Sequence, residues 1–286
     1  MQMKNPVLGK YPRQPEKQQF PDCPPGKTRY FQHDFGHYAL EARILFNRQE
    51  EWPSVFSIHG ARSDYTSTNV LTFGLQQNDI STLSVNLSGH NASSPLALNN
   101  TSLQNNIAEA SAFFDYLDCA SPITVIAHSL GGAVALNLLK RHAAKIGKLI
   151  LFCPAVYSKH AYDQSYGDDF RAAIRSPYSY RDNDTIELLE QFAGNMLLIY
   201  GQFDGLDPLA YGRPAGTSAG AIVIGNTPCY SPIPKEVVCM LADAVPDERM
   251  SLLTIPGCDH ALMTWMRADQ GRAGQVVERV TAFVKN

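Results

Sequence analysis

Residues 124–134, TVIAHSLGGAV, place a serine between an apolar run and two glycines. The first four of these residues are β-branched or small and apolar, which is typical of a buried strand. Helix-forming residues begin just after the glycines, so Ser129 falls at a sharp strand-to-helix turn. Such a turn needs small neighbours, and Ala127 and Gly131 supply them. We therefore expect the Ser129 hydroxyl to lie exposed at the end of a buried strand, beside the free N–H groups of a helix N-terminus.

The composition is that of an ordinary globular protein. The chain has 286 residues, of which 44% are hydrophobic and 18% charged, and its formal net charge is −3. This length is sufficient for one sizeable α/β domain. The small net charge gives no electrostatic basis for binding nucleic acid or an anionic membrane. No segment approaches the roughly 18–20 unbroken apolar residues of a membrane span.

The first 27 residues are rich in Pro, Gln and Lys and have no apolar core that would suggest a secretory signal. We interpret residues 1–27 as an irregular N-terminal arm, with a lid or a dimer arm as the alternative. The expected location is cytoplasmic, with no membrane or nucleic-acid partner. The sequence leaves the oligomeric state open.

Neither the cysteines nor the histidines suggest a metal site. The cysteines are far apart without a C-x-x-C pair, which predicts free thiols in a reducing compartment. His33 and His37 have a spacing that could serve a metal on a helix, but they fall at an expected hairpin turn and are interpreted as structural. We expect no metal and no organic cofactor. The six cysteines are Cys23, Cys119, Cys153, Cys229, Cys239 and Cys258.

Strand and helix patterns alternate from residue 28 onwards. The stretch 28–46 predicts two strands joined by a turn around Phe35 and Gly36. Later strands are expected within 53–60, 81–87, 123–127, 148–156, 196–201 and 250–257. Helices are expected within 66–79, 102–118, 132–143, 234–245 and 275–285. This alternation predicts a mostly parallel sheet with helices on both faces.

The turn at Ser129 resembles the nucleophile elbow of the α/β-hydrolase family, G-x-S-x-G, here Ala127-His128-Ser129-Leu130-Gly131. Alanine replaces the first glycine but keeps the side chain small. The resemblance covers about residues 30–286. It implies the α/β-hydrolase fold: a mostly parallel eight-stranded sheet with helices on both faces and a small cap insertion. Within the domain 28–286, we place the cap at about 157–195 and a long loop at about 205–232.

In this family the catalytic residues follow the chain order Ser, Asp or Glu, His. His260 in TIPGCDHALM comes just after the last expected strand and matches the base position. Asp204 in LLIYGQFDGLDP matches the acid position, with Asp207 as the competitor. Asp259 is discounted, because it would point away from the ring of the adjacent His260. The resemblance thus implies a catalytic triad of Ser129, His260 and Asp204.

The resemblance also implies an oxyanion hole formed by the backbone N–H groups of Ala61 and Leu130. His59 is expected to brace the loop that carries Ala61. Where many relatives have small residues, this chain continues with Arg62 and Asp64. Arg62 could bind a substrate carboxylate, but an ion pair with Asp64 or exposure to solvent is the simpler expectation.

Two further segments bear on the substrate. The turn NLSGHNASS (86–94) is interpreted as structural, so His90 is expected at most to line the wall of the pocket. The cap is aromatic, which suits either a substrate pocket or the packing of the cap itself. Its aromatic residues are Tyr157, Tyr162, Tyr166, Phe170, Tyr178 and Tyr180.

The first functional hypothesis is a serine hydrolase that cleaves a small or medium carboxylic ester through an acyl-enzyme. A serine at the elbow excludes the family branches that use aspartate there. The second hypothesis is thioester hydrolysis, C–C bond hydrolysis or acyl transfer by the same triad. The third is a non-catalytic binding protein on the same scaffold.

Overall fold

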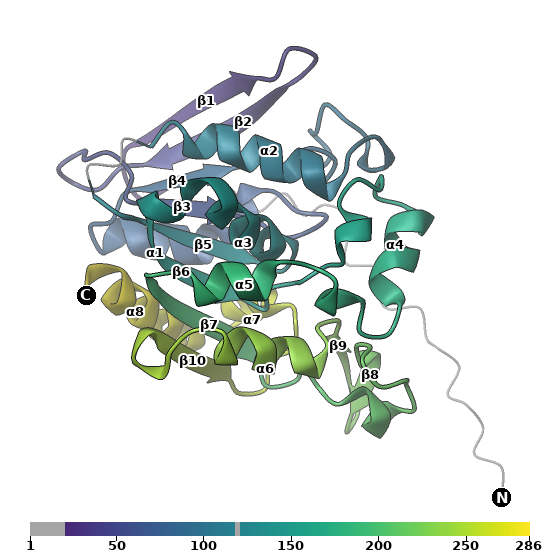
Figure 1. Ribbon diagram of the computed structural model, residues 1–286. Helices are drawn as coiled ribbons and strands as arrows, with labels where there is room; N and C mark the ends of the chain where they lie inside the picture. Colours follow the sequence, from purple (N-terminus) through teal and green to yellow (C-terminus); the bar gives the residue numbers. More distant parts are fainter. Residues whose placement is uncertain (1–20, 118–120) are drawn as a thin grey trace, which may run out of the picture.

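The computed structural model describes residues 21–117 and 121–286. An eight-stranded sheet runs through its centre in the order β1-β2-β4-β3-β5-β6-β7-β10 (Figure 1). The strands are β1 (Thr28–Asp34), β2 (Ala39–Leu45), β3 (Val55–Ile58), β4 (Thr82–Val85), β5 (Ile123–His128), β6 (Ile146–Phe152), β7 (Asn195–Gly201) and β10 (Met250–Ile255).

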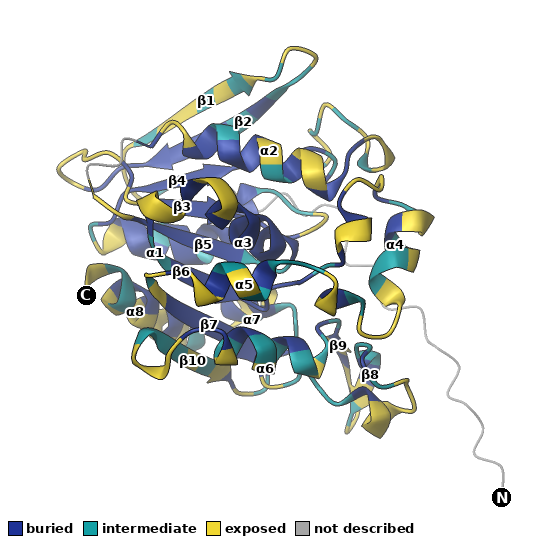
Figure 2. Ribbon diagram, in the orientation of Figure 1, coloured by how far each residue is buried: buried dark blue, intermediate teal, exposed yellow. Residues whose placement is uncertain are grey.

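The predicted sheet is confirmed. Strands β4, β3, β5, β6, β7 and β10 pair in parallel, while β1 and β2 form an antiparallel hairpin at one edge. The parallel strands are continuous apolar runs because helices cover both of their faces. Every residue of β3 and β4 is buried, and Figure 2 shows the centre of the sheet as the most buried part of the molecule.

Two helical layers cover the sheet (Figure 1). Helices α1, α7 and α8 contact one another in one layer, and α2, α3, α5 and α6 form consecutive contacts in the other. The helices are α1 (Asn69–Gln77), α2 (Leu103–Phe114), α3 (Leu130–His142), α4 (Asp168–Arg175), α5 (Thr185–Glu190), α6 (Lys235–Asp243), α7 (Leu262–Ala268) and α8 (Gln270–Lys285). None of them combines the length and apolar character that a membrane span requires.

The hairpin β1–β2 turns at Gly36, whose φ of 86° favours glycine. The His33 ring lies 4.4 Å from the Phe35 ring, and its Nδ1 is 3.0 Å from the Tyr116 hydroxyl. His33 thus packs against aromatic neighbours, in agreement with the structural interpretation.

The segment between β6 and β7 carries α4 and α5, and α4 extends away from the sheet (Figure 1). The Phe170 ring of α4 lies 5.4 Å from the Tyr157 ring and 4.8 Å from the Tyr166 ring. These aromatic contacts anchor α4 to the domain, because each pair buries apolar area with favourable edge-to-face geometry.

The segment 205–232 differs from the predicted long loop. It contains a separate two-stranded antiparallel hairpin of β8 (Gly220–Ile224) and β9 (Thr227–Ser231). The turn passes through Gly225, with a φ of 61°. The high glycine and proline content of the segment obscures the short alternating patterns of β8 and β9, which pair with each other.

The N-terminal arm is described from residue 21 onwards, and residues 1–20 lie outside the described part. Residues 21–27 form no helix or strand. Asp22 forms an ion pair with Arg43, whose side chain is fully buried, and accepts a hydrogen bond from the Tyr30 hydroxyl at 2.8 Å. This end of the arm is tied to the domain, because a buried cation needs a compensating charge.

The five cysteines in the described ranges are free. Cys119 lies outside those ranges.

Candidate active site

Ser129 occupies a strained turn between β5 and α3. Its φ and ψ are 53° and −118°, a combination that costs about 1–3 kcal/mol and persists only when neighbours enforce it. Its N–H donates to the Phe152 carbonyl at 2.9 Å, and its carbonyl accepts from the N–H of Ala155 at 3.0 Å. The small neighbours are required: a Cβ on Gly131 would lie 2.5 Å from the His59 carbonyl oxygen. The expected elbow is present.

The structure brings Ser129, His260 and Asp204 together. His260 follows β10, and Asp204 follows β7. The Ser129 Oγ lies 2.8 Å from His260 Nε2, and His260 Nδ1 lies 2.7 Å from Asp204 Oδ2. An ionised carboxylate can only accept hydrogen bonds, so Nδ1–H of a neutral His260 is the donor to Asp204. Nε2 is then an acceptor aimed at the Ser129 hydroxyl.

The Asp204 carboxylate is buried and held at both oxygens. Its Oδ1 accepts the backbone N–H of Gly205 at 3.0 Å and that of Ile233 at 3.3 Å. Oδ2 is thereby directed at His260.

The two other aspartates serve the surrounding loops. Asp207 caps a 3₁₀ turn by accepting the N–H of Leu209 at 3.0 Å. Asp259 accepts from Trp265 Nε1 at 2.9 Å and from the N–H of Tyr230 at 2.8 Å. Neither is hydrogen-bonded to the His260 imidazole, so the geometry favours the predicted Asp204 over both.

The loop after β3 lies against the elbow. A Cβ on Gly60 would lie 3.3 Å from the Ser129 Cβ. The backbone N–H groups of Ala61 and Leu130 have no hydrogen-bond acceptor within residues 21–117 and 121–286. Leu130 begins α3, so its N–H has no partner inside the helix. These N–H groups can therefore donate to a ligand beside Ser129.

His59 braces this loop, as expected. Its Nε2 accepts the N–H of Leu87 at 3.1 Å, and its Nδ1 lies 2.7 Å from the Gly60 carbonyl oxygen. Nε2 is therefore the acceptor and Nδ1–H the donor, which is the hydrogen-bonding pattern of a neutral imidazole. Burial lowers the pKa of His59 and keeps it in that form.

Of the two simpler expectations for Arg62, the structure favours exposure to solvent, because no ion pair with Asp64 occurs among the described residues. Asp64 instead caps the 3₁₀ turn at Tyr65–Thr68 by accepting the N–H of Thr66 at 2.9 Å. Hydrogen bonds within the turn stabilise the position of Asp64 more than an ion pair with the exposed Arg62 would. Arg62 has a left-handed backbone with a φ of 55° and an exposed side chain.

His90 lies beside the same loop and is buried. Its Nδ1 accepts the backbone N–H of Arg62 at 3.4 Å, and its Nε2 lies 2.8 Å from Asn106 Oδ1. Burial, assisted by the neighbouring His59, lowers the pKa of His90 to about 3. His90 is thus a neutral support of the loop, a more specific role than the wall predicted from its position.

No role for His128, the residue before Ser129, was predicted from the sequence. Its Nε2 lies 3.3 Å from the His260 carbonyl oxygen, and the two rings are 5.6 Å apart. A carbonyl only accepts, so Nε2 carries the proton. Burial lowers the pKa of His128 to about 3, and the neighbouring His260 adds to this shift. His128 therefore positions the loop of His260 as a neutral donor.

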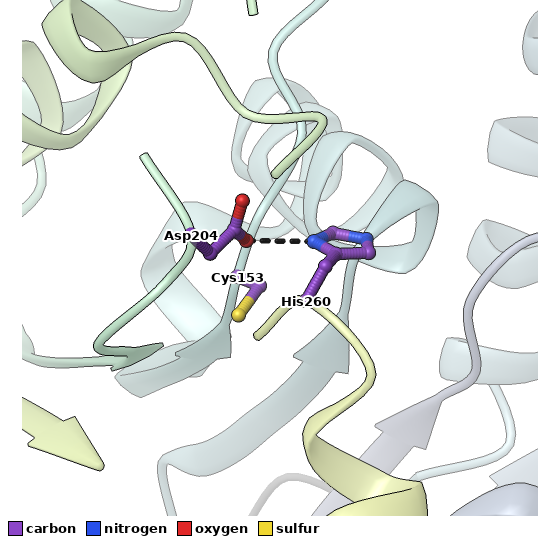
Figure 3. A group of neighbouring side chains, drawn as sticks. All are labelled: Cys153, Asp204 and His260. Atoms are coloured by element: carbon purple, nitrogen blue, oxygen red, sulfur yellow. Dashed lines mark hydrogen bonds and ion pairs between the residues drawn. The ribbon is translucent and has the colours of Figure 1, made fainter. Parts of the chain in front are cut away.

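Cys153 was also unassigned, and Figure 3 shows it beside Asp204 and His260. Ligand atoms of the three residues lie within 4.8 Å of one another. Such a set could bind a soft metal only as a thiolate. Burial and then the Asp204 charge raise the pKa of the Cys153 thiol well above its usual range. The arrangement therefore favours a protonated thiol beneath the hydrogen-bonded pair over a metal site.

Comparison with known proteins agrees with the fold. A family model described as serine aminopeptidase S33, Hydrolase_4, matches residues 49–177. No curated protein matches the sequence. Among solved structures, a soluble variant of monoglyceride lipase from Saccharomyces cerevisiae superposes with a TM-score of 0.66 at 13% identity, covering 93% of this chain and 97% of that one. The chain has the α/β-hydrolase fold.

Two further solved structures illustrate the range of proteins to which this chain is similar. Est1E from Butyrivibrio proteoclasticus, solved with ferulic acid, has a TM-score of 0.62 and 17% identity, with 88% of this chain and 97% of that chain covered. A thioesterase domain from the curacin biosynthetic pathway has a TM-score of 0.59 and 14% identity, with coverage of 91% and 100%. At these identities the similarity establishes the fold and leaves the substrate open.

Proposed function

We propose that this α/β-hydrolase cleaves a small or medium carboxylic ester through an acyl-enzyme on Ser129. The observation that carries the proposal is the continuous hydrogen-bonded series Ser129 Oγ, His260 Nε2, His260 Nδ1 and Asp204 Oδ2, with distances of 2.8 and 2.7 Å. A serine hydroxyl is a weak nucleophile until a positioned base accepts its proton. The series supplies that base and fixes its tautomer.

In the first step, Ser129 Oγ forms a bond to the carbonyl carbon as its proton moves to His260 Nε2. The negative charge that develops on the carbonyl oxygen is accepted by the N–H groups of Ala61 and Leu130. Such donors are typically worth about 2.7–4 kcal/mol each. Asp204 stabilises the imidazolium without taking its proton.

The C–O bond to the alcohol then breaks, and His260 returns the proton to the leaving oxygen. Water attacks the acyl-enzyme with His260 again as base, which releases the acid and restores Ser129. The residues named here complete this cycle without electron transfer.

The same machinery suits a thioester, since only the leaving atom differs. A thioesterase domain is among the structurally similar proteins, so thioester hydrolysis is the second candidate function. Esters and thioesters with the same acyl group would separate the two substrate classes by their kcat/KM values.

The first test is covalent labelling with a fluorophosphonate, followed by intact mass. We expect one adduct on the wild type and none on Ser129→Ala or His260→Ala. His160→Ala is the matched control, because the His160 side chain is 87% exposed and pairs with Asp182 instead. A folded wild type that gains no adduct would contradict the proposal and favour a non-catalytic binding protein.

A further inference from the structure

Helix α2 presents two buried polar side chains, Asn106 and Glu109, which lie three residues apart on one face. Both contact Ser88, in the turn that follows β4. The Glu109 Oε2 atom accepts the Ser88 N–H at 2.9 Å. Asn106 Nδ2 donates to the Ser88 carbonyl at 3.2 Å and to Glu109 Oε2 at 3.0 Å. The helix thus holds this turn through both backbone groups of one residue.

These contacts determine the orientation of the Asn106 side-chain amide. A backbone carbonyl only accepts hydrogen bonds, so the Asn106 atom that lies 3.2 Å from the Ser88 oxygen is the NH₂ group. The other atom of the amide, Oδ1, lies 2.8 Å from His90 Nε2 and 2.8 Å from the Tyr166 hydroxyl. Oδ1 can only accept, so His90 carries its proton on Nε2.

The opposite side of the His90 ring leads independently to the same tautomer. A backbone N–H only donates, and the N–H of Arg62 lies 3.4 Å from His90 Nδ1. Nδ1 is therefore the unprotonated acceptor, as the Asn106 contact requires. Burial lowers the pKa of His90 to about 3, so the ring is neutral at pH 7 and carries a single proton.

The hydrogen bond to Arg62 bears on the loop that carries the proposed oxyanion donor. Arg62 directly follows Ala61, and its φ of 55° lies in the left-handed region, which residues other than glycine adopt rarely. Such a conformation persists only when neighbouring groups enforce it. His90 contributes by accepting the Arg62 N–H. Because the Ala61 and Arg62 amides are consecutive, a change in the Arg62 backbone would also turn the Ala61 N–H.

We propose that Asn106 and His90 are positioning residues for the oxyanion hole. Asn106 selects the His90 tautomer, and His90 Nδ1 then holds the Arg62 amide so that the Ala61 N–H faces the substrate oxygen. This inference rests on the proposed acyl transfer, in which Ala61 is an oxyanion donor. The effect is expected mainly in the transition state, because the substrate oxygen becomes charged there.

Two substitutions of His90 separate a hydrogen-bonding role from a role in filling space. His90→Asn can place its amide oxygen near the former Nδ1 position and keep an acceptor for Arg62, although the side chain is smaller. His90→Gln is closer in size and reaches the former Nε2 position, but it offers Arg62 no acceptor. We expect His90→Asn to retain at least threefold more kcat than His90→Gln on 4-nitrophenyl butyrate. An equal or higher kcat for His90→Gln would overturn the inference.

Asn106→Ala removes the acceptor of the Nε2 proton and allows the other tautomer to form. We expect kcat to fall at least tenfold while KM changes less than twofold. Affinity for a trifluoromethyl ketone, which forms a charged adduct with serine, should fall by a factor similar to that in kcat. Asn47→Ala is the matched control, because Asn47 is a buried asparagine beyond β2 with two hydrogen bonds to Glu51. It should leave kcat unchanged. A loss confined to KM, or equal losses of kcat in both variants, would overturn the inference.

A measurement on the wild type separates this inference from the hydrolytic proposal and requires no variant to fold. NMR of protein labelled with ¹⁵N-histidine distinguishes the two neutral tautomers by the shifts of their ring nitrogens. At pH 7 we expect the His90 proton on Nε2. A proton on Nδ1, or an exchanging mixture of the two tautomers, would overturn the inference whether or not the protein is active. A wild type with the Nε2–H tautomer that gains no fluorophosphonate adduct would support the assigned tautomer and contradict the proposed function.

Discussion

A single added methyl group at Gly131 tests whether the small residues of the elbow are required by packing. A Cβ at this position would lie 2.5 Å from the His59 carbonyl oxygen and 2.8 Å from that of Ile58. Both obstacles are backbone atoms at the end of β3, so no side-chain rotation can relieve them. The substitution Gly131→Ala must separate α3 from the loop that carries Ala61.

The size of the effect follows from that overlap. Bringing the shortest contact to about 3 Å requires a shift of about 0.5 Å. A misplacement of about 1 Å can cost roughly a hundredfold in rate, so we expect about a tenfold loss in fluorophosphonate labelling rate. Overpacking of this kind also lowers the free energy of unfolding by about 1–3 kcal/mol. The Tm should fall by several degrees.

Labelling rate by intact mass and Tm by calorimetry measure the two effects separately. Gly274→Ala in α8 is the matched control, because a Cβ there would meet no atom within 4 Å. It should leave labelling unchanged and raise stability by up to about 1 kcal/mol through helix propensity. A Gly131→Ala protein that labels within twofold of wild type and keeps its Tm would refute the packing argument.

Three further outcomes are expected. Asp204→Asn should lower kcat/KM by about 10³–10⁴ because the amide favours the wrong His260 tautomer, while Asp207→Asn should change it less than threefold; equal losses would contradict the assignment. The pKa of His90 is lowered to about 3 from an ordinary 6.5, so the unfolded chain binds its proton first as pH falls. Its contribution to stability is complete above pH 6.5 and should fall by about 2 kcal/mol between pH 7 and 5. Because burial lowers the pKa of His59 and His128 as well, the whole protein should lose more than this in urea unfolding; His90→Gln should remove about 2 kcal/mol of the loss, and an unchanged slope would count against it. In thiol titration of the native protein, the exposed Cys239 should react with a disulfide reagent within minutes, whereas the buried Cys153, with its raised pKa, should react only after denaturation; rapid modification of both would be inconsistent with the structure.

The parts of the fold that the sequence predicted depend on local patterns. The apolar run before Ser129, the small residues around it and the strand-ending positions of Asp204 and His260 are visible within short windows. The structure brings these three side chains together because parallel strands end at the same edge of the sheet.

The parts that escaped prediction depend on contacts between distant segments. His128 was passed over because its role follows from the carbonyl of His260, 132 residues further on. The position of Cys153 beside the site could not be predicted, because it depends on the proximity of Asp204, which follows the next strand of the chain. The capping role of Asp64 did have a local signal, since an aspartate two residues before Thr66 is a favourable cap. The sequence analysis considered Asp64 only as a possible ion-pair partner of Arg62 and missed this signal.

The separation of the proposed catalytic residues along the chain has a consequence for the protein's synthesis. The proposed nucleophile Ser129 and its proposed base His260 are 131 residues apart, and His260 follows Asp204 by 56 residues. At about 5–20 residues per second, a ribosome that has completed the elbow needs roughly 7–26 s more to add His260. Throughout that interval the nascent chain carries its serine without the group that would activate it. Under the proposed function, acyl chemistry at Ser129 is therefore delayed until the loop that carries His260 has been synthesised.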